Sequence, residues 1–576
     1  MRLARAYSFS LSLAIAGLLV ACGGGGGGGD GSSDAGGDAA LEGSSLTGVE
    51  TGVPVNRVFE RSITNTNAYA NKFADVTLMA EYTAPSGRKV SFWGFYDGDG
   101  AGGQDGNVWK LRFMPDEPGT WTYTYAWSDG TTGGSGTFDA VTARAGRGLL
   151  QPYEGNPRWL AYGGKNPVFL KSYYIGAGGI TGVPIDWAAD RIYSKISARG
   201  YNHVQMNMLP IGWTYQKPSD APADHLSQPL WRESPRVQNL KVWKRMEEHV
   251  AWLNSMNIGI HFFMGLDPKP SGSADQYFAL QRLDGMSGDD RAFYIRYLAA
   301  RLAPFANISG WNYTWETDGN GSERAMADLL AQYDPWSHLR TYHDEYPQDN
   351  DFGNGSYNFA GIENHGYFGN GNGNPATDSA SHYQATIDAY RGKPVYMVEG
   401  NGLWRACWAK DAAETSITRS AWAVTLAGGS FTWQDTPDCD FTDPSSSMFT
   451  WPSANPMVDR VEVLYKVMTQ DVVFHRMAPR NDLLAGCWNT FDGGGPVPAS
   501  PCYALAEPGK QYVVFKEDGG AFNLTVDAGT YRATWIDTRT GARQAVTGGS
   551  VSGTGAPVQF VSPSSSTDWA LVLTAQ

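Results

Sequence analysis

Hydrophobic and polar residues alternate with a period of two in two stretches of the chain, residues 55–146 and residues 486–576. The first stretch contains short alternating segments such as Gly119–Tyr125, separated by Gly, Asp and Pro turns. The second contains Tyr512–Phe515 and Tyr531–Asp537, followed by a Thr-Gly turn. Short strands with period-two patterning and frequent turns are typical of β-sandwiches. We therefore predict a small β-sandwich in each stretch.

Between them, in residues 147–485, short apolar runs rich in β-branched residues alternate with helical patterns. This alternation indicates parallel strands joined by crossover helices, and eight such strands close a barrel. The predicted strands are Pro167–Ser172, Asn202–Asn207, Ile258–Met264, Gly310–Trp315, Leu339–His343, Ala360–Asn364, Pro394–Glu399 and Gly429–Gln434. The expected fold class is therefore α/β, a (β/α)8 TIM barrel flanked by N-terminal and C-terminal β-sandwich domains.

Two of the crossover helices can be placed from their apolar spacing. Val237–Met256 has apolar residues at helical intervals, and a second helix carries Phe293, Tyr297 and Leu302. Asp289 precedes that second stripe and is predicted to cap the helix. We interpret both stripes as hydrophobic core.

The first 54 residues are predicted to serve export and attachment. Arg2 and Arg5 precede an apolar run, Leu11–Val20, which is too short to span a membrane, so residues 1–21 read as a signal peptide. Its end, Leu19 to Cys22, resembles the bacterial lipobox, which implies acylation of Cys22; a plain signal peptide is the alternative. Residues 22–54 are rich in Gly, Ser and Ala and are expected to form a flexible tether. The expected location is the bacterial cell envelope, with the outer membrane as the site of the lipid anchor.

The other four cysteines are expected to form disulfides. An even number of cysteines in an exported chain favours disulfides. Cys487 and Cys502 bracket a Gly/Pro-rich loop and are predicted to pair, while Cys407 and Cys439 each follow a neighbouring predicted barrel strand. A thiolate metal site is the alternative, but the close Cys-x-x-Cys spacing is missing.

Composition narrows the range of partners. The formal net charge is −14 with scattered Lys and Arg, so the chain lacks the basic stripe that tracks a nucleic acid backbone. Aromatic residues make up 13% of the chain and include 21 Trp. Indole and phenol rings stack on the C–H faces of sugars, so an extracellular polysaccharide or oligosaccharide is the expected partner, with contact to the membrane through the lipid only.

No cofactor or metal ion is expected. Asp97, Asp99 and Asp105 carry the hard oxygens that calcium prefers. The same Asp-Gly pairs are also common hairpin-turn chemistry, and we favour the turn.

Two glutamates at predicted strand ends are the candidate catalytic residues. Glu316 ends the fourth predicted strand and Glu399 ends the seventh, about three βα units later at roughly thirty residues a unit. Active sites of such barrels lie at the carboxyl ends of the strands. Both side chains are therefore expected to reach one site.

This layout resembles the clan A glycoside hydrolases. Trp311–Glu316 looks like the end of strand four in those enzymes, and Lys393–Glu399 looks like strand seven. The resemblance implies that Glu316 is the general acid/base and Glu399 the nucleophile. One departure is that the clan usually has Asn immediately before the acid/base, whereas this chain has Trp315.

The flanking domains also resemble modules of such enzymes. Phe92–Gly100 and Trp109–Pro115 are similar to an N-terminal sandwich module without assigned function that precedes many bacterial barrel glycosidases. The last domain resembles a C-terminal module that is sometimes labelled collagen-binding. Its residues do not support collagen as a ligand, and packing against the barrel is the favoured interpretation.

Two carboxyl groups fit glycoside hydrolysis because the leaving oxygen must be protonated while an anion stabilises the oxocarbenium-like transition state. Retention requires the two groups to lie about 5 to 5.5 Å apart, and inversion requires about 6.5 to 9.5 Å. The retaining mechanism is favoured. If Glu316 is not the general acid, Glu345 or Glu363 is the alternative.

Further residues near strand ends are expected to contact substrate. Each of them could instead serve packing. His365 and Tyr367 are also candidates for a hydrogen bond to Glu399. The expected substrate-binding residues are Lys171, Asn207, His343, His365, Tyr367, Trp404 and Trp433, with Trp213, Trp231 and Trp408 as further stacking candidates.

Two other classes of function are alternatives. The first is a surface glycan-binding lipoprotein whose barrel has lost catalysis, and it is supported by the departure at Trp315, where the clan usually has Asn. Polysaccharide lyase or esterase chemistry has less support, because the sequence lacks a Gly-x-Ser-x-Gly elbow and a zinc helix motif.

Overall fold

A computed structural model gives the structure of the protein. It describes residues 51–142, 147–175, 180–208, 224, 226, 228, 230–264, 286–313, 322–343, 356–364, 393–400, 410–434, 456–487 and 501–576. Of some residues in these ranges, including Glu363, Glu399 and Trp433, only the backbone is described. All of the described residues belong to one unit of the chain, Leu46–Gln576.

The N-terminal module is a β-sandwich of two sheets, with strand orders β1-β8-β7-β3-β4 and β2-β6-β5. The strands are β1 (Thr51–Pro54), β2 (Phe59–Thr64), β3 (Leu78–Thr83), β4 (Lys89–Trp93), β5 (Phe95–Tyr96), β6 (Val108–Phe113), β7 (Gly119–Trp127) and β8 (Gly134–Val141). Aromatic rings join the two sheets: Phe59 stacks on Phe138, and Tyr82 stacks on Phe113, each with ring centroids 4.0 Å apart. The predicted sandwich is confirmed.

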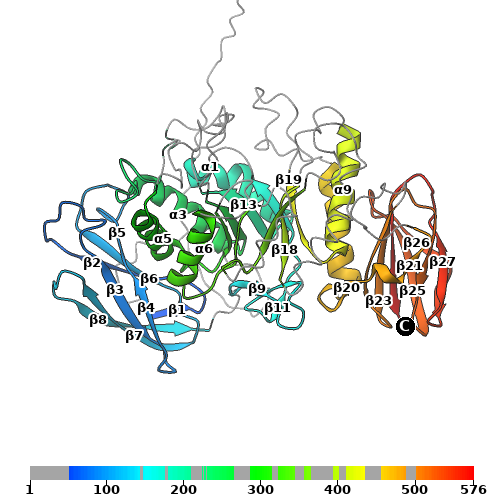
Figure 1. Cartoon of the computed structure of the whole chain (residues 1–576), viewed down its shortest axis with the longest axis horizontal. Coiled ribbons are helices and arrows are strands. Elements are labelled where there is room, and N and C mark those ends of the chain that lie inside the picture. Colours follow the sequence, from blue (N-terminus) through cyan, green and yellow to red (C-terminus); the bar gives the residue numbers. More distant parts are fainter. Residues whose placement is uncertain are drawn as a thin grey trace, which may run out of the picture. The chain divides into compact units, whose positions relative to one another are not determined.

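Eight parallel strands form the barrel sheet, in the order β16-β15-β14-β13-β12-β19-β18-β17. They are β12 (Ser172–Ile175), β13 (His203–Asn207), β14 (Gly259–Phe263), β15 (Ile308–Asn312), β16 (Arg340–Thr341), β17 (Ala360–Asn364), β18 (Val395–Gly400) and β19 (Ser430–Gln434). Figure 1 labels β13, β18 and β19 of this sheet. The predicted fold class, a (β/α)8 barrel with flanking β-sandwiches, is confirmed. It places the carboxyl ends of the strands on one edge of the barrel.

The start of the first barrel strand differs from the prediction. Pro167 belongs to a small antiparallel sheet of β9 (Leu150–Pro152), β10 (Leu160–Tyr162) and β11 (Asn166–Pro167), and the barrel strand begins only at Ser172. Residues 167–175 form a nearly continuous apolar run, in which alternation cannot mark where barrel pairing starts.

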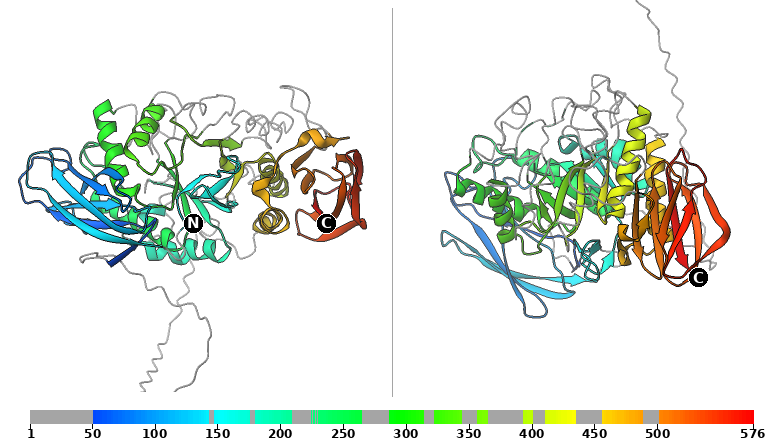
Figure 2. Two further views of the ribbon diagram at one scale, coloured as in Figure 1. Left: turned by 90° about the horizontal axis from the view of Figure 1, so that it is seen from below. Right: turned by 45° about the vertical axis from the view of Figure 1, so that its right-hand side comes forward.

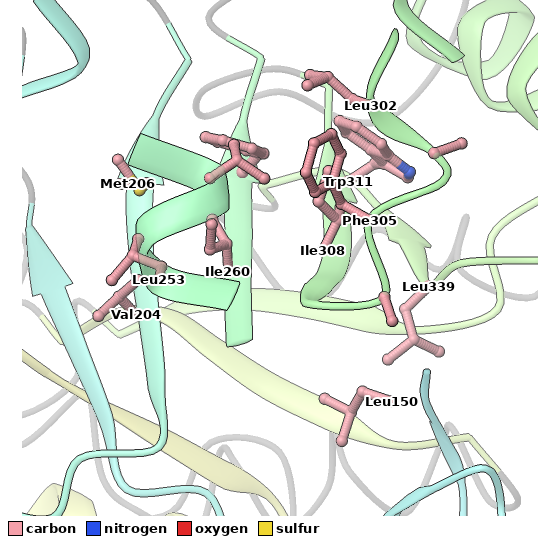
Figure 3. Packing of buried hydrophobic residues seen from close by; sticks show 14 of the residues in the cluster. Leu150, Val204, Met206, Leu253, Ile260, Leu302, Phe305, Ile308, Trp311 and Leu339 are labelled. Carbon is pink, nitrogen blue, oxygen red and sulfur yellow. The ribbon is translucent and has the colours of Figure 1, made fainter. Parts of the chain in front are cut away.

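Helices pack against the outer face of the barrel sheet. The longer ones are α3 (Leu240–Ser255), α5 (Gly288–Leu302), α6 (Ser322–Tyr333), α9 (Lys410–Leu426) and α10 (Pro456–Lys466). Shorter helical turns are η1 (Ile180–Gly182), α1 (Ile185–Ala188), η2 (Ala189–Tyr193), α2 (Ser194–Ala198), η6 (Val467–Asp471) and η7 (Phe474–Arg476). Figure 3 shows Leu253 of α3 beside Val204 and Ile260, and all three are buried.

The predicted cap of α5 was wrong by two residues. Ser287 is the N-cap, and its hydroxyl accepts a hydrogen bond from the amide of Asp290 over 3.2 Å. Asp289 lies in the first turn, where its negative charge favours the helix dipole. Both residue types cap helices well, and only the backbone geometry selects between them.

The barrel sheet approaches closure between β16 and β17, which have no direct ladder pairing in the described residues. The amide of Gly361 donates to the hydroxyl of Thr341 over 2.7 Å, and the amide of Arg340 donates to the side chain of Asn358 over 2.7 Å. A Cβ on Gly361 would lie 2.6 Å from the carbonyl oxygen of Tyr342. Glycine is therefore required for this close approach of the two strands.

The C-terminal module is a second sandwich, drawn in orange and red in Figure 2, with strand orders β20-β22-β23-β28-β25-β26 and β21-β24-β27. Its elements are β20 (Ala478–Pro479), η8 (Asn481–Leu483), β21 (Leu484–Ala485), β22 (Cys502–Glu507), β23 (Gln511–Lys516), β24 (Ala521–Thr525), β25 (Gly529–Asp537), β26 (Arg543–Gly553), β27 (Pro557–Val561) and β28 (Trp569–Ala575). It packs on α9, where Trp422 stacks on Phe515 at 5.4 Å and Arg419 forms an ion pair with Asp568 at 2.7 Å.

A disulfide joins Cys487 to Cys502, the pair expected from the sequence, with Cα atoms 5.9 Å apart. Cys407 and Cys439 lie outside the described residues. Within the described ranges, every helix falls short of the length and hydropathy that a membrane span requires.

Candidate active site

Polar residues that face the barrel interior form layers, and the lowest layer, near the amino ends of the strands, is a buried hydrogen-bond network. The hydroxyl of Ser172 lies 2.7 Å from Nδ1 of His203 and 2.7 Å from the hydroxyl of Tyr396. Nε2 of His203 lies 2.7 Å from the hydroxyl of Ser309. Burial lowers the pKa of His203 to about 3, so this imidazole is neutral at physiological pH. This uncharged layer, called the neutral floor below, lies beneath the carboxyl ends of the strands.

In the next layer toward the carboxyl ends of the strands, Gln205 of β13 and His261 of β14 are register partners and lie side by side. Both are essentially unexposed. Neither polar atom of the Gln205 side chain, nor Nε2 of His261, has a hydrogen-bond partner within the described part of the chain. Burial, followed by His203 and His343, holds the pKa of His261 well below its usual range. These two neutral groups can donate or accept hydrogen bonds without bringing a charge.

At the carboxyl ends of the strands, Asn207 of β13 and Asn312 of β15 lie on either side of Phe263 in the strand register. Asn207 is 4% exposed and Asn312 is 0% exposed. Oδ1 of Asn207 and both polar atoms of the Asn312 side chain lack a partner among the described residues. Buried polar groups are nearly always hydrogen-bonded in native proteins, so these carboxamides are positioned to bind a polar ligand.

His343 follows β16 and is also fully buried, with its ring 5.4 Å from that of Phe263. It therefore joins Asn207 and Asn312 at the same end of the barrel. Two predicted substrate-binding residues, Asn207 and His343, are thus brought together by the fold.

Glu399 lies on β18, the seventh barrel strand, three residues beyond Tyr396 of the lowest layer. Its register partner on β17 is Glu363, and the register shifts between Ile362 and Glu363. Irregular pairing of this kind is common next to active sites. The backbone thus positions two acidic residues side by side at the carboxyl ends of strands six and seven.

Lys171 does not occupy the position expected of a substrate-binding residue. It precedes β12, at the amino end of the barrel, because the strand begins later than predicted. Its ammonium group forms an ion pair with Glu462 and donates to the carbonyl of Arg199 over 2.6 Å. These contacts at the opposite end of the barrel make Lys171 a structural residue.

Two of the Trp candidates, Trp231 and Trp433, lie in the described ranges, and only Trp231 has a described side chain. Trp231 is 6% exposed and its ring meets that of Tyr294 on α5 at 5.0 Å, so it is a core residue and the expected stacking role was wrong. Trp433 pairs with Tyr173 of β12 in the strand register.

The remaining expected site residues lie outside the described residues. They are Glu316, Glu345, His365, Tyr367, Trp213, Trp404, Trp408 and Cys22.

Sequence reasoning missed Gln205, His261 and Asn312. A signal was present, because polar residues recur at every second position of His203–Asn207 inside an apolar barrel strand. Alternation of this kind marks the inward face of a strand and could have identified Gln205.

The aspartates of the β5–β6 turn are engaged in ion pairs and turn hydrogen bonds. Asp97 pairs with Lys110 and Arg301, while Oδ1 of Asp99 accepts from the amides of Ala101 and Gly103. This agrees with the turn interpretation. Across the described ranges, no group of three or more His, Cys, Asp or Glu residues is arranged to hold a metal ion.

Comparison with known proteins places the fold among glycoside hydrolase structures. Residues 53–128 match a family model described as a domain of unknown function, DUF5060. No curated protein matches the sequence.

Among solved structures, a protein from Bacteroides vulgatus ATCC 8482, provisionally assigned as a glycoside hydrolase, is 17% identical with a TM-score of 0.65 and covers 92% of this chain and 100% of its own. A glycoside hydrolase family 5 protein from the same organism is 16% identical with a TM-score of 0.57 and covers 74% of this chain and 94% of its own. At these identities the likeness establishes the fold, a (β/α)8 barrel with additional β domains.

Proposed function

We propose that the protein is a retaining glycoside hydrolase that cleaves an extracellular polysaccharide or oligosaccharide, with Glu399 as nucleophile and Glu316 as general acid/base. The observation that carries the proposal is the position of Glu399 on the seventh barrel strand, at the edge where Oδ1 of Asn207 and the carboxamide of Asn312 are buried without a partner among the described residues. Carboxamides bind sugar hydroxyls because each can donate and accept. The likeness to glycoside hydrolase structures adds support.

In the proposed mechanism, the carboxylate of Glu399 attacks the anomeric carbon while Glu316 protonates the leaving oxygen. Water then attacks the glycosyl-enzyme ester, Glu316 accepts its proton, and Glu399 leaves as a carboxylate. The neutral floor of Ser172 and His203 places no competing charge beneath the nucleophile.

Substitution of the two glutamates tests the mechanism. Glu399→Gln and Glu316→Gln are each expected to lower turnover by a factor of at least about 10³ on a substrate found by screening a polysaccharide panel. Circular dichroism and thermal unfolding should match those of the unmodified protein. Ordinary activity in either variant would exclude that residue.

Azide separates this proposal from a surface glycan-binding protein. Azide needs no proton from the enzyme and is small enough to replace the water. In Glu316→Ala it should therefore restore turnover on a substrate with a good leaving group and yield the glycosyl azide of retained configuration. A glycan-binding protein would bind the polysaccharide with no turnover to restore.

We also propose that Cys22 carries a lipid that holds the enzyme to the outer membrane. Cys22→Ser is expected to move the protein from the membrane fraction to the soluble fraction of the producing cell and to abolish incorporation of labelled fatty acid. Unchanged fractionation and labelling would contradict the anchor.

A further inference from the structure

The N-terminal module, whose family has no assigned function, contacts α5 and the residues after α6 through its aromatic residues. The ring of Phe92 meets that of Trp336 after α6 at 4.8 Å, and the guanidinium of Arg296 on α5 lies 4.8 Å from the ring of Trp93. Phe95 packs on Tyr297 at 6.0 Å. These aromatic side chains of the module face the barrel and are unavailable as stacking platforms for a sugar.

A closed ring of six charges lies in the same interface. Glu60 binds Lys110 and Arg112, with contacts of 3.0 and 2.5 Å. Lys110 also binds Asp97 at 3.0 Å, and Asp97 binds Arg301 of α5 at 2.8 Å.

Glu247 of α3 closes the ring, with contacts of 2.6 Å to Arg301 and 3.0 Å to Arg112. Signs alternate around the ring, so each charge has opposite neighbours. Burial opposes the ionisation of Glu247, but Arg112 and Arg301 outweigh it and lower its pKa. Both arginines are almost unexposed, at 4% for Arg112 and 1% for Arg301. Separation of the module from the barrel would break the two ion pairs of the ring that cross between them, Arg112 to Glu247 and Arg301 to Asp97.

The module also holds both ends of α3. At the start of the helix, the side chain of Gln104 donates to the carbonyl of Gln238 over 2.7 Å and accepts from the amide of Leu240. The helix needs this partner, because its own N-cap, Asn239, makes no side-chain cap hydrogen bond. At the other end, the guanidinium of Arg57 donates to the carbonyl and the side chain of Asn254. A cation at a helix C-terminus also favours the helix dipole.

Helices α3 and α5 pack on the outer face of the strands that build the candidate site. In chain order, α3 joins β13 to β14, and α5 joins β14 to β15. Those three strands carry Asn207, His261 and Asn312. A displacement of α3 or α5 would therefore move the polar residues that face the barrel interior.

We infer that the N-terminal module is an intramolecular clamp that fixes α3, α5 and α6 on the barrel, and that its function is to stabilise the site-bearing strands instead of binding sugar as a separate module. The inference does not depend on Glu316 or Glu399, so it stands or falls independently of the proposed hydrolase activity.

Hydrogen exchange in the full chain tests the clamp. The double variant Gln104→Ala, Arg57→Ala changes only module residues that are partly exposed, so the sandwich itself should fold. The clamp predicts that amide exchange in α3 increases on the order of tenfold, because both helix ends lose a capping partner. Exchange in β22–β28 of the C-terminal module should stay unchanged.

A matched control removes an exposed ion pair of the module that does not contact the barrel. Lys89 and Glu81 form a 2.7 Å pair with 63% and 44% of their side chains exposed, and Lys89→Met should leave exchange in α3 unaltered. Arg112→Met provides a second test, since it should raise exchange in both α3 and α5. If α3 exchanges at the rate of the unmodified protein in both test variants, or equally fast in the control, the clamp is excluded.

Discussion

Asn307 and Asn312 show how two buried asparagines a few residues apart can serve different purposes. The side-chain amide of Asn307 donates to the carbonyls of Val250 and Ile258, over 3.1 and 3.3 Å, and so joins the second half of α3 to the residue before β14. Oδ1 of Asn307 has no partner within the described residues, so this side chain is bonded through its nitrogen only, whereas neither polar atom of the Asn312 side chain has a partner there. An unpaired buried carboxamide costs stability, so its retention at a strand end indicates a binding role.

The pair yields opposite predictions for stability and activity. Asn312→Ala is expected to change the free energy of unfolding by less than about 1 kcal/mol, because little protein bonding is lost, and to lower kcat/KM about tenfold or more. Asn307→Ala should cost about 1 to 3 kcal/mol while leaving kcat/KM of the folded enzyme unchanged. Denaturant titration and steady-state kinetics measure both quantities. A large stability loss in Asn312→Ala with normal kcat/KM would contradict the binding role.

Among the structural elements, the contact between β16 and β17 depends on a side-chain hydrogen bond and a glycine. The Thr341 hydroxyl takes the place of a ladder partner for the amide of Gly361. Strand β16 spans only Arg340–Thr341, so it offers little backbone for ladder pairing with β17. The contact is therefore sensitive to any added side-chain volume at position 361.

Gly361→Ala is expected to destabilise the protein by about 1 to 3 kcal/mol, because the new methyl group would lie 2.6 Å from the Tyr342 carbonyl oxygen and 2.9 Å from the Thr341 hydroxyl. Gly288→Ala is the control, since a Cβ there meets nothing within 4 Å. Alanine at the start of α5 should be neutral or slightly stabilising. Equal midpoints of urea unfolding for the two variants would refute the packing argument.

The number and order of the barrel strands could be predicted from the sequence, because each strand is an apolar run bounded by turns or helices. Their precise limits could not be predicted: apolar residues stand on both sides of Lys171 and Ser172, and only pairing with β13 and β19 shows that the strand is Ser172–Ile175. The displaced start also explains the error at Lys171. His261 and Asn312 were missed because neither strand shows polar residues at every second position: His261 stands among apolar residues in β14, and Ser309 and Asn312 of β15 are three positions apart.

On the scale of the whole molecule, a disulfide closes a loop within the C-terminal module, between β21 and β22. Cys487 and Cys502 are separated by 15 residues, and Cys502 begins β22. A loop of this size restricts the unfolded chain and stabilises the folded one by about 3 kcal/mol.

The double variant Cys487→Ala, Cys502→Ala is therefore expected to lose about 3 kcal/mol of unfolding free energy. Calorimetry should assign the lower Tm to the transition that includes the C-terminal module. The unmodified protein, unfolded in the presence of a thiol reductant, should show the same loss. A variant as stable as the oxidised protein would exclude a stabilising role for this bond.

The N-terminal module contacts both ends of α3, and this limits how far the chain can be shortened. Trimming the chain to the barrel at residue 147 would remove one of the two counterions of Glu247 and one of the two of Arg301, and would expose Tyr297 and Trp336 to water. Such a fragment should be recovered as aggregated material, however carefully the cut is chosen. The smallest soluble form of this barrel therefore begins before Arg57, well upstream of its first strand.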